Sequence, residues 1–368
     1  MKKRILTAGP YVGGKEEEYV LDAVKNGWNE NWNKYLNKFE DSIAKYVGVK
    51  YAMATSSCTG AMHLALQSIG IKKGDEVIVP DLTWIATAAV VNNVGATPIF
   101  AEITPDSWTL DPSGLEKKIT KKTKAIMPVH LYGYPAEMDR IMEIAKENNL
   151  YVVEDAAPSL GAEYKSKKTG SFGDISAFSF QGAKLVVTGE GGMLLSDNEE
   201  LFGIAGELND YGRANKVTAT IDRIGYKYRM SNLQAAFGLA QLENIDYLID
   251  CKRNIFNWYD ERLRDIEGFK LNRELKNTKS IYWMTSLTLD SRISTSRDDL
   301  MKRLDKEFNV DTRPVLKKVS KYSMFKEADN PIAKRVSETS LNLPSGVCLK
   351  EEDIDYVCNS IKSIIHNR

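Results

Sequence analysis

Strand-like and helix-like segments alternate along the chain from about residue 50 to residue 180, and this alternation constrains the fold more than any other feature. Strands that alternate with helices build a parallel sheet with a helix in each crossover. The sequence therefore predicts an α/β fold with a largely parallel, doubly wound sheet. The strand-like runs are 51–55, 76–80, 97–101, 124–129, 151–155 and 175–180, with helices expected through 61–67, after Trp84 and over 136–148.

The second half of the chain begins with a helix signal. Ser231 is followed three residues later by Gln234, a capping box, and apolar residues then recur at helical spacing, so we expect a long helix that ends near Asp265. The segments beyond it predict a smaller α+β domain. We place the boundary inside the long helix, which gives a large domain over residues 1–245 and a small carboxyl-terminal domain over residues 246–368.

Charge and composition exclude several classes of function. Lys and Arg number 50 and Asp and Glu number 50, so no net field attracts nucleic acid or an anionic membrane. The amino terminus is basic, but its apolar run is too short for a signal peptide, and no other run is long enough to span a membrane. A cytoplasmic location is expected. The four cysteines lack paired spacing and histidines number 3, so we expect free thiols and no metal centre.

Lys184 lies just after the carboxyl end of a predicted strand. The strand-like run 175–180 leads into Gln181-Gly-Ala-Lys184, and the chain leaves through a glycine-rich turn into a second apolar run. A lysine placed at the end of a buried strand, and not on a solvated helix, is a candidate for Schiff-base chemistry.

Asp155 ends another strand-like run, Leu150-Tyr-Val-Val-Glu-Asp155. Open α/β sheets bind their ligands at the carboxyl ends of the strands. A carboxylate and a lysine at two such ends are suited to pyridoxal phosphate, because the lysine bonds to the aldehyde and the acid keeps the pyridine nitrogen protonated. Glu154 and Asp155 cannot act as a glycosidase pair, since neighbours on a strand face opposite sides of the sheet.

Four more residues are candidates for holding such a cofactor. Cys58 and Thr59 lie in a strand-to-helix turn whose free amides suit a phosphate, although a plain helix cap explains the turn as well. Trp84 follows a strand end and can stack on a ring or pack in the core. Ser179 alternates with two phenylalanines and can reach the phosphate or be satisfied internally.

Eight ordered blocks, spread over almost the whole chain, resemble the DegT-type sugar nucleotide aminotransferases. The resemblance implies fold type I of the pyridoxal phosphate enzymes, with a large doubly wound, mainly parallel seven-stranded sheet, a smaller α+β domain, and homodimers whose active sites are shared between subunits. The blocks are SSCTGAMHLAL, DLTWIATA, MPVHLYG, VVEDAA, FSFQGAK, TGEGGM, YKYRMSNLQAA and LNLPSG.

The same resemblance implies a role for each candidate. Lys184 is the Schiff-base lysine and later the base that moves a proton, and Asp155 pairs with the pyridine nitrogen. Trp84 stacks on the cofactor ring. The phosphate contacts fall to three small residues: Cys58, Thr59 and Ser179. Dehydratase relatives have histidine in place of this lysine, so Lys184 favours amino transfer.

Three positions depart from the family pattern. Pro158 stands where glutamine or glutamate is common, which removes a side-chain contact to the cofactor hydroxyl. Lys227 replaces an asparagine that reaches the phosphate of the neighbouring subunit's cofactor, and an ammonium can do so with more charge. The segment 315–322 lacks the usual tyrosine, proline and histidine and carries three lysines, which suit a phosphorylated substrate or form a solvated basic turn.

The predicted function is amino transfer from L-glutamate to a nucleotide-linked 4-keto-6-deoxy sugar in surface polysaccharide biosynthesis. One alternative keeps the chemistry but uses a small phosphorylated ketone or a keto sugar without a nucleotide. Another is a non-catalytic regulator that binds pyridoxal phosphate.

Overall fold

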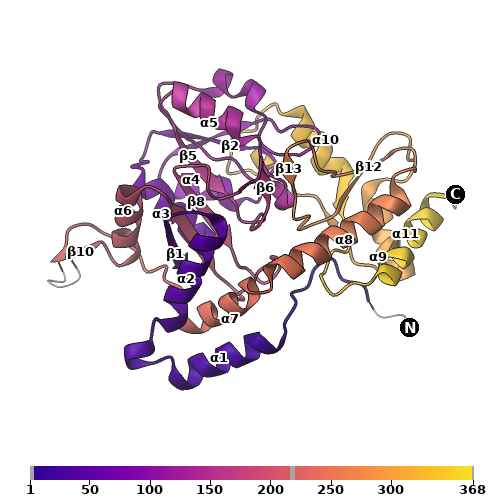
Figure 1. The fold of residues 1–368 in the computed structure, drawn as a ribbon. Helices are drawn as coiled ribbons and strands as arrows, with labels where there is room; N and C mark the ends of the chain where they lie inside the picture. Colours follow the sequence, from indigo (N-terminus) through magenta and orange to yellow (C-terminus); the bar gives the residue numbers. More distant parts are fainter. Residues whose placement is uncertain (1–3, 216–219, 367–368) are drawn as a thin grey trace.

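The large sheet has seven strands and is central to the molecule (Figure 1). The computed structural model describes residues 4–215 and 220–366, so Met1 to Lys3 of the basic amino terminus lie outside the described residues. β9 is antiparallel to both of its neighbours, and the other pairs are parallel. The predicted α/β fold with a mainly parallel sheet is confirmed. In spatial order the strands are β1 (Tyr51–Thr55), β9 (Gly192–Ser196), β8 (Ile175–Ser179), β5 (Tyr151–Asp155), β4 (Thr123–Ile126), β2 (Glu76–Pro80) and β3 (Thr97–Ala101).

Helices cover both faces of this sheet because its strands are apolar on both sides. Within β2, Val77 and Val79 pack in the cluster that includes α3, α4 and α6, whereas Ile78 packs in the cluster of α5. On that second face, α2 and α7 cover the other half of the sheet. The helices are α2 (Lys34–Val47), α3 (Cys58–Ser68), α4 (Ala86–Asn93), α5 (Met138–Glu147), α6 (Glu199–Asn209) and α7 (Asn232–Leu242).

The long helix expected from Ser231 to about Asp265 is in fact two helices. The capping box forms as predicted, with the Gln234 amide nitrogen 3.3 Å from Ser231 Oγ. The first helix, α7, ends at Leu242, and α8 (Ile245–Leu263) follows. At Asn244 the backbone leaves helical dihedrals, and the side-chain amide donates to the Ala240 carbonyl at 3.3 Å. The Asn244 side chain thus interrupts the helix, although the apolar residues of the sequence keep their helical spacing across this point.

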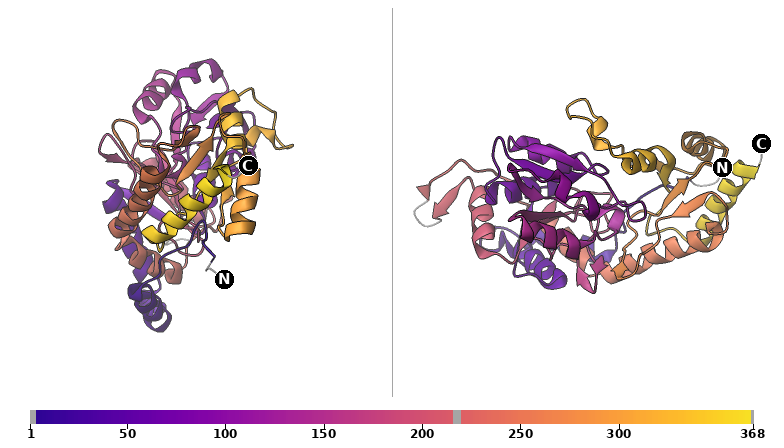
Figure 2. Two further views of the ribbon diagram at one scale, coloured as in Figure 1. Left: turned by 90° about the vertical axis from the view of Figure 1, so that its right-hand side faces the viewer. Right: turned by 90° about the horizontal axis from the view of Figure 1, so that it is seen from above.

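α8 leads from the large sheet to a second, four-stranded antiparallel sheet (Figures 1 and 2). Its first turns pack in the cluster of the large sheet through Leu248 and Ile249, and its later turns pack in the other cluster through Ile255 and Tyr259. A division of the chain near residue 245 remains a prediction. The smaller part contains β12 (Phe269–Leu271), β14 (Ser286–Leu289), β15 (Arg313–Pro314), β16 (Ser340–Asn342), α9 (Arg297–Phe308), α10 (Pro331–Thr339) and α11 (Glu351–His366).

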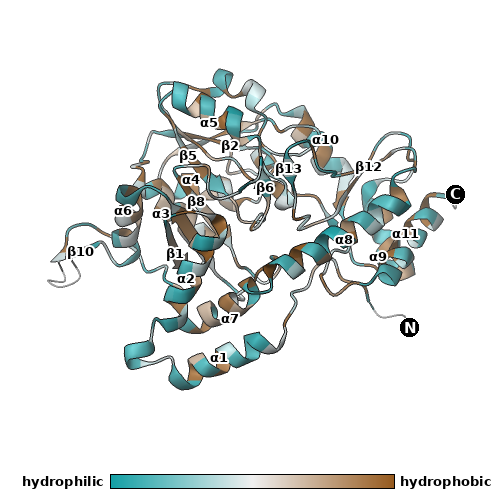
Figure 3. Ribbon diagram, in the orientation of Figure 1, coloured by the Kyte–Doolittle hydropathy of each residue, from teal (hydrophilic) through white to brown (hydrophobic). Residues whose placement is uncertain are grey.

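The remaining elements lie at the periphery. A hairpin of β10 (Arg213–Asn215) and β11 (Thr220–Ile221) projects from the end of the large sheet that is remote from α11. The ribbon of α7 is mostly in the hydrophobic colour, whereas α1 (Gly14–Asn26) carries both hydrophilic and hydrophobic colour (Figure 3). Among the described residues, no helix combines the length and the apolar character needed to cross a bilayer. Three short strands form a further sheet: β6 (Glu163–Tyr164), β7 (Lys167–Lys168) and β13 (Thr278–Lys279).

Gly192 lets the start of α3 lie directly against β9. A Cβ atom added at Gly192 would lie 2.6 Å from the Ser57 carbonyl oxygen and closer still to the Cys58 nitrogen. Both contacts are backbone atoms, which cannot rotate away. A residue without a side chain is therefore required here for the first turn of α3 to keep its position.

We expect Gly192→Ala to lower the free energy of unfolding by about 1–3 kcal/mol, because the added methyl overpacks a backbone contact. The matched control is Gly203→Ala on the exposed side of α6, where nothing lies within 4 Å of an added Cβ. That change should be neutral or stabilising, since alanine is the better helix former. Urea unfolding of the cofactor-free proteins measures both, and equal midpoints would contradict the prediction.

Candidate active site

A cavity of about 550 Å³ opens at the carboxyl edge of the large sheet. Its lining comes from both parts of the molecule: strand ends and turns of the large sheet on one side, and the segments around β14, β15 and β16 on the other. Parallel strands bring their carboxyl ends to one edge, which is where α/β sheets place ligands. Six of the seven candidate residues line this cavity: Cys58, Thr59, Trp84, Asp155, Ser179 and Lys184.

Asp155 ends β5 with its carboxylate buried at the cavity. One carboxylate oxygen accepts from Thr87 Oγ1 at 2.7 Å, and the other accepts from the Ala157 amide at 3.2 Å. Burial raises the pKa of Asp155, and the Thr87 hydroxyl opposes this by stabilising the charged form. An acid held by two donors in a buried site is oriented and is in need of a cationic partner.

Glu154 points to the opposite face of the sheet, as the alternation of strand side chains predicted. Its carboxylate lies 2.9 Å from His130 Nε2 and accepts three backbone amides of the turn that precedes β8. Glu154 therefore fixes this turn, and Asp155 alone faces the cavity. The three amide donors are Gly170, Phe172 and Gly173, at 2.7–2.8 Å.

Lys184 reaches the same cavity from the turn that follows β8. The turn is closed by the Lys184 amide, which donates to the Gln181 carbonyl at 2.8 Å. Burial lowers the pKa of Lys184 to about 8, against the attraction of Cys58 and Asp155. At pH 8 about half of the amines are then neutral, whereas an ordinary lysine is almost fully charged. The chain thus supplies a nucleophilic amine near neutral pH.

The first turn of α3 lines one end of the cavity. α3 begins at Cys58, and Ser57 caps it by accepting the Gly60 amide at 3.0 Å. The amides at the start of a helix have no partner within the helix and carry partial positive charge. Burial raises the pKa of the Cys58 thiol, so the thiol stays neutral and does not repel an anion. Ser179 lines the same cavity.

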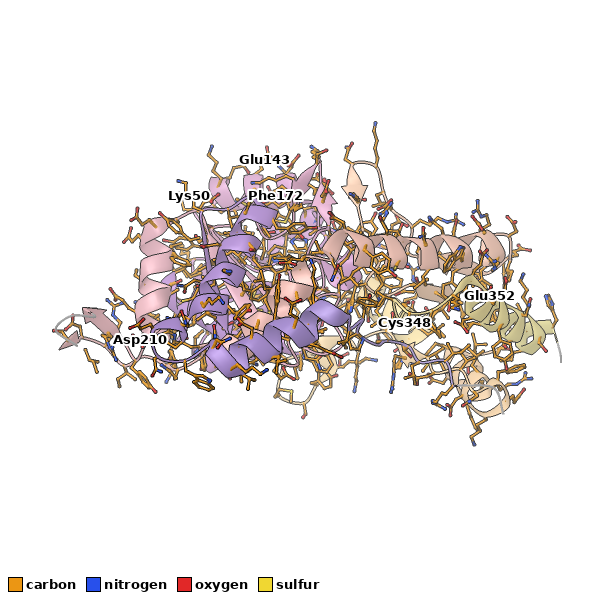
Figure 4. The ribbon with its side chains drawn as sticks, turned by 60° about the horizontal axis from the view of Figure 1, so that its bottom comes forward. Lys50, Glu143, Phe172, Asp210, Cys348 and Glu352 are labelled. Carbon is orange, nitrogen blue, oxygen red and sulfur yellow. The ribbon has the colours of Figure 1, made fainter. Side chains whose placement is uncertain are left out.

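Trp84 and Lys227 differ from the other candidates in their surroundings. Trp84 lines the cavity but is 64% exposed, so much of its side chain is open to solvent. Lys227 does not line the cavity in the single chain. Its Nζ lies 3.9 Å from Asp210 Oδ1, beside the base of the β10–β11 hairpin, where Figure 4 labels Asp210.

The sequence did not single out several lining residues. Trp283 places its ring centroid 3.9 Å from Lys184 Nζ, although the sequence predicts for its segment only membership of the smaller α+β domain. Thr87 does not line the cavity itself, but it is fully buried beside it and donates to Asp155; it lies three residues after Trp84, in the block DLTWIATA. Arg313 and Asn342 come from the small sheet, and nothing local in the sequence marks them as cavity residues.

Comparison with known proteins shows the family of this chain. Residues 10–362 match the model of the DegT/DnrJ/EryC1/StrS aminotransferase family. The chain belongs to this family. It is 41% identical to the GDP-perosamine synthase of Escherichia coli O157:H7, with 98% of each chain covered. The predicted family and enzyme class are confirmed.

Solved structures of sugar aminotransferases share the fold. One is DesI, described in the presence of its TDP-sugar product, with a TM-score of 0.92, 27% identity, and coverage of 100% of this chain and 95% of that chain. Another is the PLP-form of the putative sugar aminotransferase Spr1654 from Streptococcus pneumoniae, with a TM-score of 0.92, 25% identity and 98% of each chain covered.

The basic segment 315–322 does not bring its lysines to the cavity. Lys318 is buried, with its Nζ 3.8 Å from Asp81 Oδ2 and bonded to the Ala328 carbonyl. Lys321 pairs with Glu338 at 3.0 Å, and Lys317 lies over the ring of Tyr322. In this family member the cavity wall is formed by Leu316 and the residues before it.

Lys318 is therefore expected to stabilise the fold and not to bind a substrate phosphate. Lys318→Met should lower the free energy of unfolding by about 3 kcal/mol, because it leaves the buried Asp81 carboxylate without its cation. The control is Lys317→Met, which removes an exposed lysine of the same segment. Urea unfolding and the KM of the keto substrate separate the roles: a raised KM with unchanged stability for Lys318→Met would overturn the assignment.

Proposed function

We propose that this aminotransferase uses pyridoxal phosphate to move an amino group from L-glutamate to a nucleotide-linked 4-keto-6-deoxy sugar, a perosamine synthase-like step in surface polysaccharide biosynthesis. The observation that carries the proposal is the lining of one cavity by Lys184, Asp155 and the first turn of α3. The 41% identical GDP-perosamine synthase and the TDP-sugar of the DesI structure support a nucleotide-linked substrate.

The residues present fit the cofactor. Asp155 would hold the pyridine nitrogen, Trp84 would lie on the ring, and the amides of the α3 turn would hold the phosphate, with Cys58, Thr59 and Ser179 around it. When bound, pyridoxal phosphate supplies an aldehyde that reacts with amines and a protonated ring that withdraws electrons. The protonated pyridine nitrogen would be the cationic partner of the buried Asp155 carboxylate.

Lys184 does the proton chemistry. Its lowered pKa keeps a large part of its amine neutral, so it can take a proton from the amino donor's α-carbon and return one to the reacting carbon of the sugar. Asp155 has a different role in this proposal: Thr87 and Ala157 orient its carboxylate, which is left to hold the pyridine nitrogen. The base and the acid that holds the cofactor ring are thus different side chains.

The alternatives lose support from the geometry. The small phosphorylated ketone was favoured by the lysines of 315–322, and none of these lines the cavity. A non-catalytic regulator needs the cofactor but not a base, whereas both Lys184 and Asp155 face the same cavity. Arg313 is the guanidinium that lines the cavity among the described residues, and it provides a site for a carboxylate or phosphate of either substrate.

We further propose a homodimer with shared active sites. Lys227 lies outside its own chain's cavity, next to a hairpin that projects from the large sheet (Figure 1). Exposed apolar side chains surround this end of the molecule, Ile221 and Ile224 among them, and such a surface suits a partner chain. A second copy would cover the exposed part of Trp84 and bring Lys227 to the phosphate of its cofactor.

The proposed activity is tested with purified protein, L-glutamate and a panel of GDP-linked and TDP-linked 4-keto-6-deoxy sugars, with product masses as the readout. One sugar should gain an amino group in place of its keto oxygen. Lys184→Ala should abolish turnover, and borohydride should no longer fix the cofactor at residue 184. The matched control is Lys50→Ala, an exposed lysine that Figure 4 labels, which should retain full activity.

The outcomes separate the hypotheses. Amination of simple keto phosphates, and of no nucleotide sugar, would favour the alternative substrate. Cofactor binding at Lys184 without turnover of any ketone would favour the regulator. Failure of wild-type protein to bond the cofactor at Lys184 would refute the proposed function as a whole.

Shared sites are tested by coexpressing Lys184→Ala and Lys227→Ala chains with different tags and isolating the mixed dimer. If each site takes Lys184 from one chain and Lys227 from the other, the mixed dimer has one intact site and about half of the wild-type activity. Each variant alone should be weak or inactive. A mixed dimer no more active than the Lys227→Ala homodimer would contradict shared sites.

A further inference from the structure

Trp283 is tied to Lys184 by two contacts. Its ring centroid lies 3.9 Å from Lys184 Nζ, and its indole Nε1 donates to the carbonyl of Ala183, the residue before the lysine, at 2.7 Å. The second contact fixes the ring relative to the peptide from which the lysine extends. The indole ring is therefore held beside the lysine amine. Trp283 itself belongs to the opposite side of the cavity, which the segments around β14, β15 and β16 form.

Trp283 is itself held from behind by a buried lysine. Lys252 on α8 is 4% exposed, and its Nζ donates to the Trp283 carbonyl at 2.8 Å and to the Ser345 carbonyl. Burial lowers the pKa of Lys252 to about 7, and no carboxylate of the described residues is among the groups that shift this pKa. An ammonium buried against carbonyl groups alone is costly. Its two bonds join α8, the segment before β14 and the turn after β16, so the position of Trp283 depends on it.

We propose that Trp283 is a positioning residue that holds the free amine of Lys184, and that Lys252 fixes Trp283 for this task. The proposal rests on the proposed function, in which Lys184 is released from the cofactor in every cycle and then moves a proton. A free lysine has many rotamers, and an aromatic face at 3.9 Å favours the one in which the amine stays in the cavity.

Other groups also act on this amine. Asp155 faces it from β5 and Cys58 from α3, and both raise its pKa while burial lowers it. Tyr132 packs against Trp283, with ring centroids 5.9 Å apart, and so supports the ring. The ring adds to these effects by stabilising the ammonium form. Its removal should lower the pKa of Lys184 by about one pH unit.

The test uses cofactor-free protein. The pH dependence of trace acetylation at Lys184, followed by mass spectrometry of the peptide, gives the pKa of the free amine. Trp283→Leu removes the ring, and Trp283→Phe keeps an aromatic face but loses the bond to Ala183. We expect the pKa to fall by about one unit in Trp283→Leu and by less in Trp283→Phe, because phenylalanine retains a weaker cation–π contact.

The control is Trp28→Leu, which removes an exposed indole that also donates to a backbone carbonyl, that of Val24, at 2.7 Å. Its Lys184 pKa should equal that of wild type. An unchanged or raised pKa in Trp283→Leu would overturn the proposal. Thermal midpoints show whether each variant is folded at the temperature of the measurement.

Lys252→Met supplies a second, independent readout, because it changes no group that contacts Lys184. If Lys252 positions Trp283, the Lys184 pKa should shift downwards in this variant too, by less than in Trp283→Leu. If Lys252 only stabilises the fold, the pKa stays at the wild-type value and that part of the proposal is wrong. None of these measurements needs bound cofactor, so they succeed or fail separately from the proposed function.

Discussion

The arrangement of this structure around its cavity depends on two ionisable groups, an acid and an amine, that are buried at one edge of the large sheet. The Asp155 carboxylate and the Lys184 amine line the same cavity, and burial acts on both pKa values in the direction of neutrality. Such groups destabilise the folded protein unless a ligand joins them. A flat cofactor that offers an aldehyde to one and a cationic nitrogen to the other would remove both costs, so its binding would stabilise the folded protein.

The parts of the site that the sequence revealed are those that lie at strand ends. Asp155, Ser179 and Lys184 follow or end apolar runs, and a parallel sheet must bring such ends to one edge whatever the loops do. Cys58 and Thr59 could be found because a helix start is a local signal. In each case a short stretch of chain determines both the position of the residue and the direction of its side chain.

The parts that the sequence did not reveal depend on contacts between distant segments. Trp283 and Arg313 reach the cavity only because the small sheet packs against the large one, and no periodicity reports that packing. The break at Asn244 depends on one side-chain amide, although the apolar spacing continues through it. The lysines of 315–322 suggested a phosphate site or a solvated turn because a sequence gives the charge of a residue but not its burial. Lys318 is buried and pairs with Asp81, more than two hundred residues earlier in the chain.

Chemistry and substrate choice are divided between the two sides of the cavity. The groups that we propose to react or to hold the cofactor come from the large sheet, whose strand ends are fixed by its core. The opposite wall comes from the segments around β14, β15 and β16. Asp81 anchors the segment that follows β15, through the Ser320 amide at 2.7 Å and the Asn330 side chain at 2.8 Å. A change in that wall alters what fits against the cofactor without moving Lys184. Trp283 is the exception, because it belongs to the wall and contacts the base, and so it links the shape of the substrate side to the behaviour of the reacting amine.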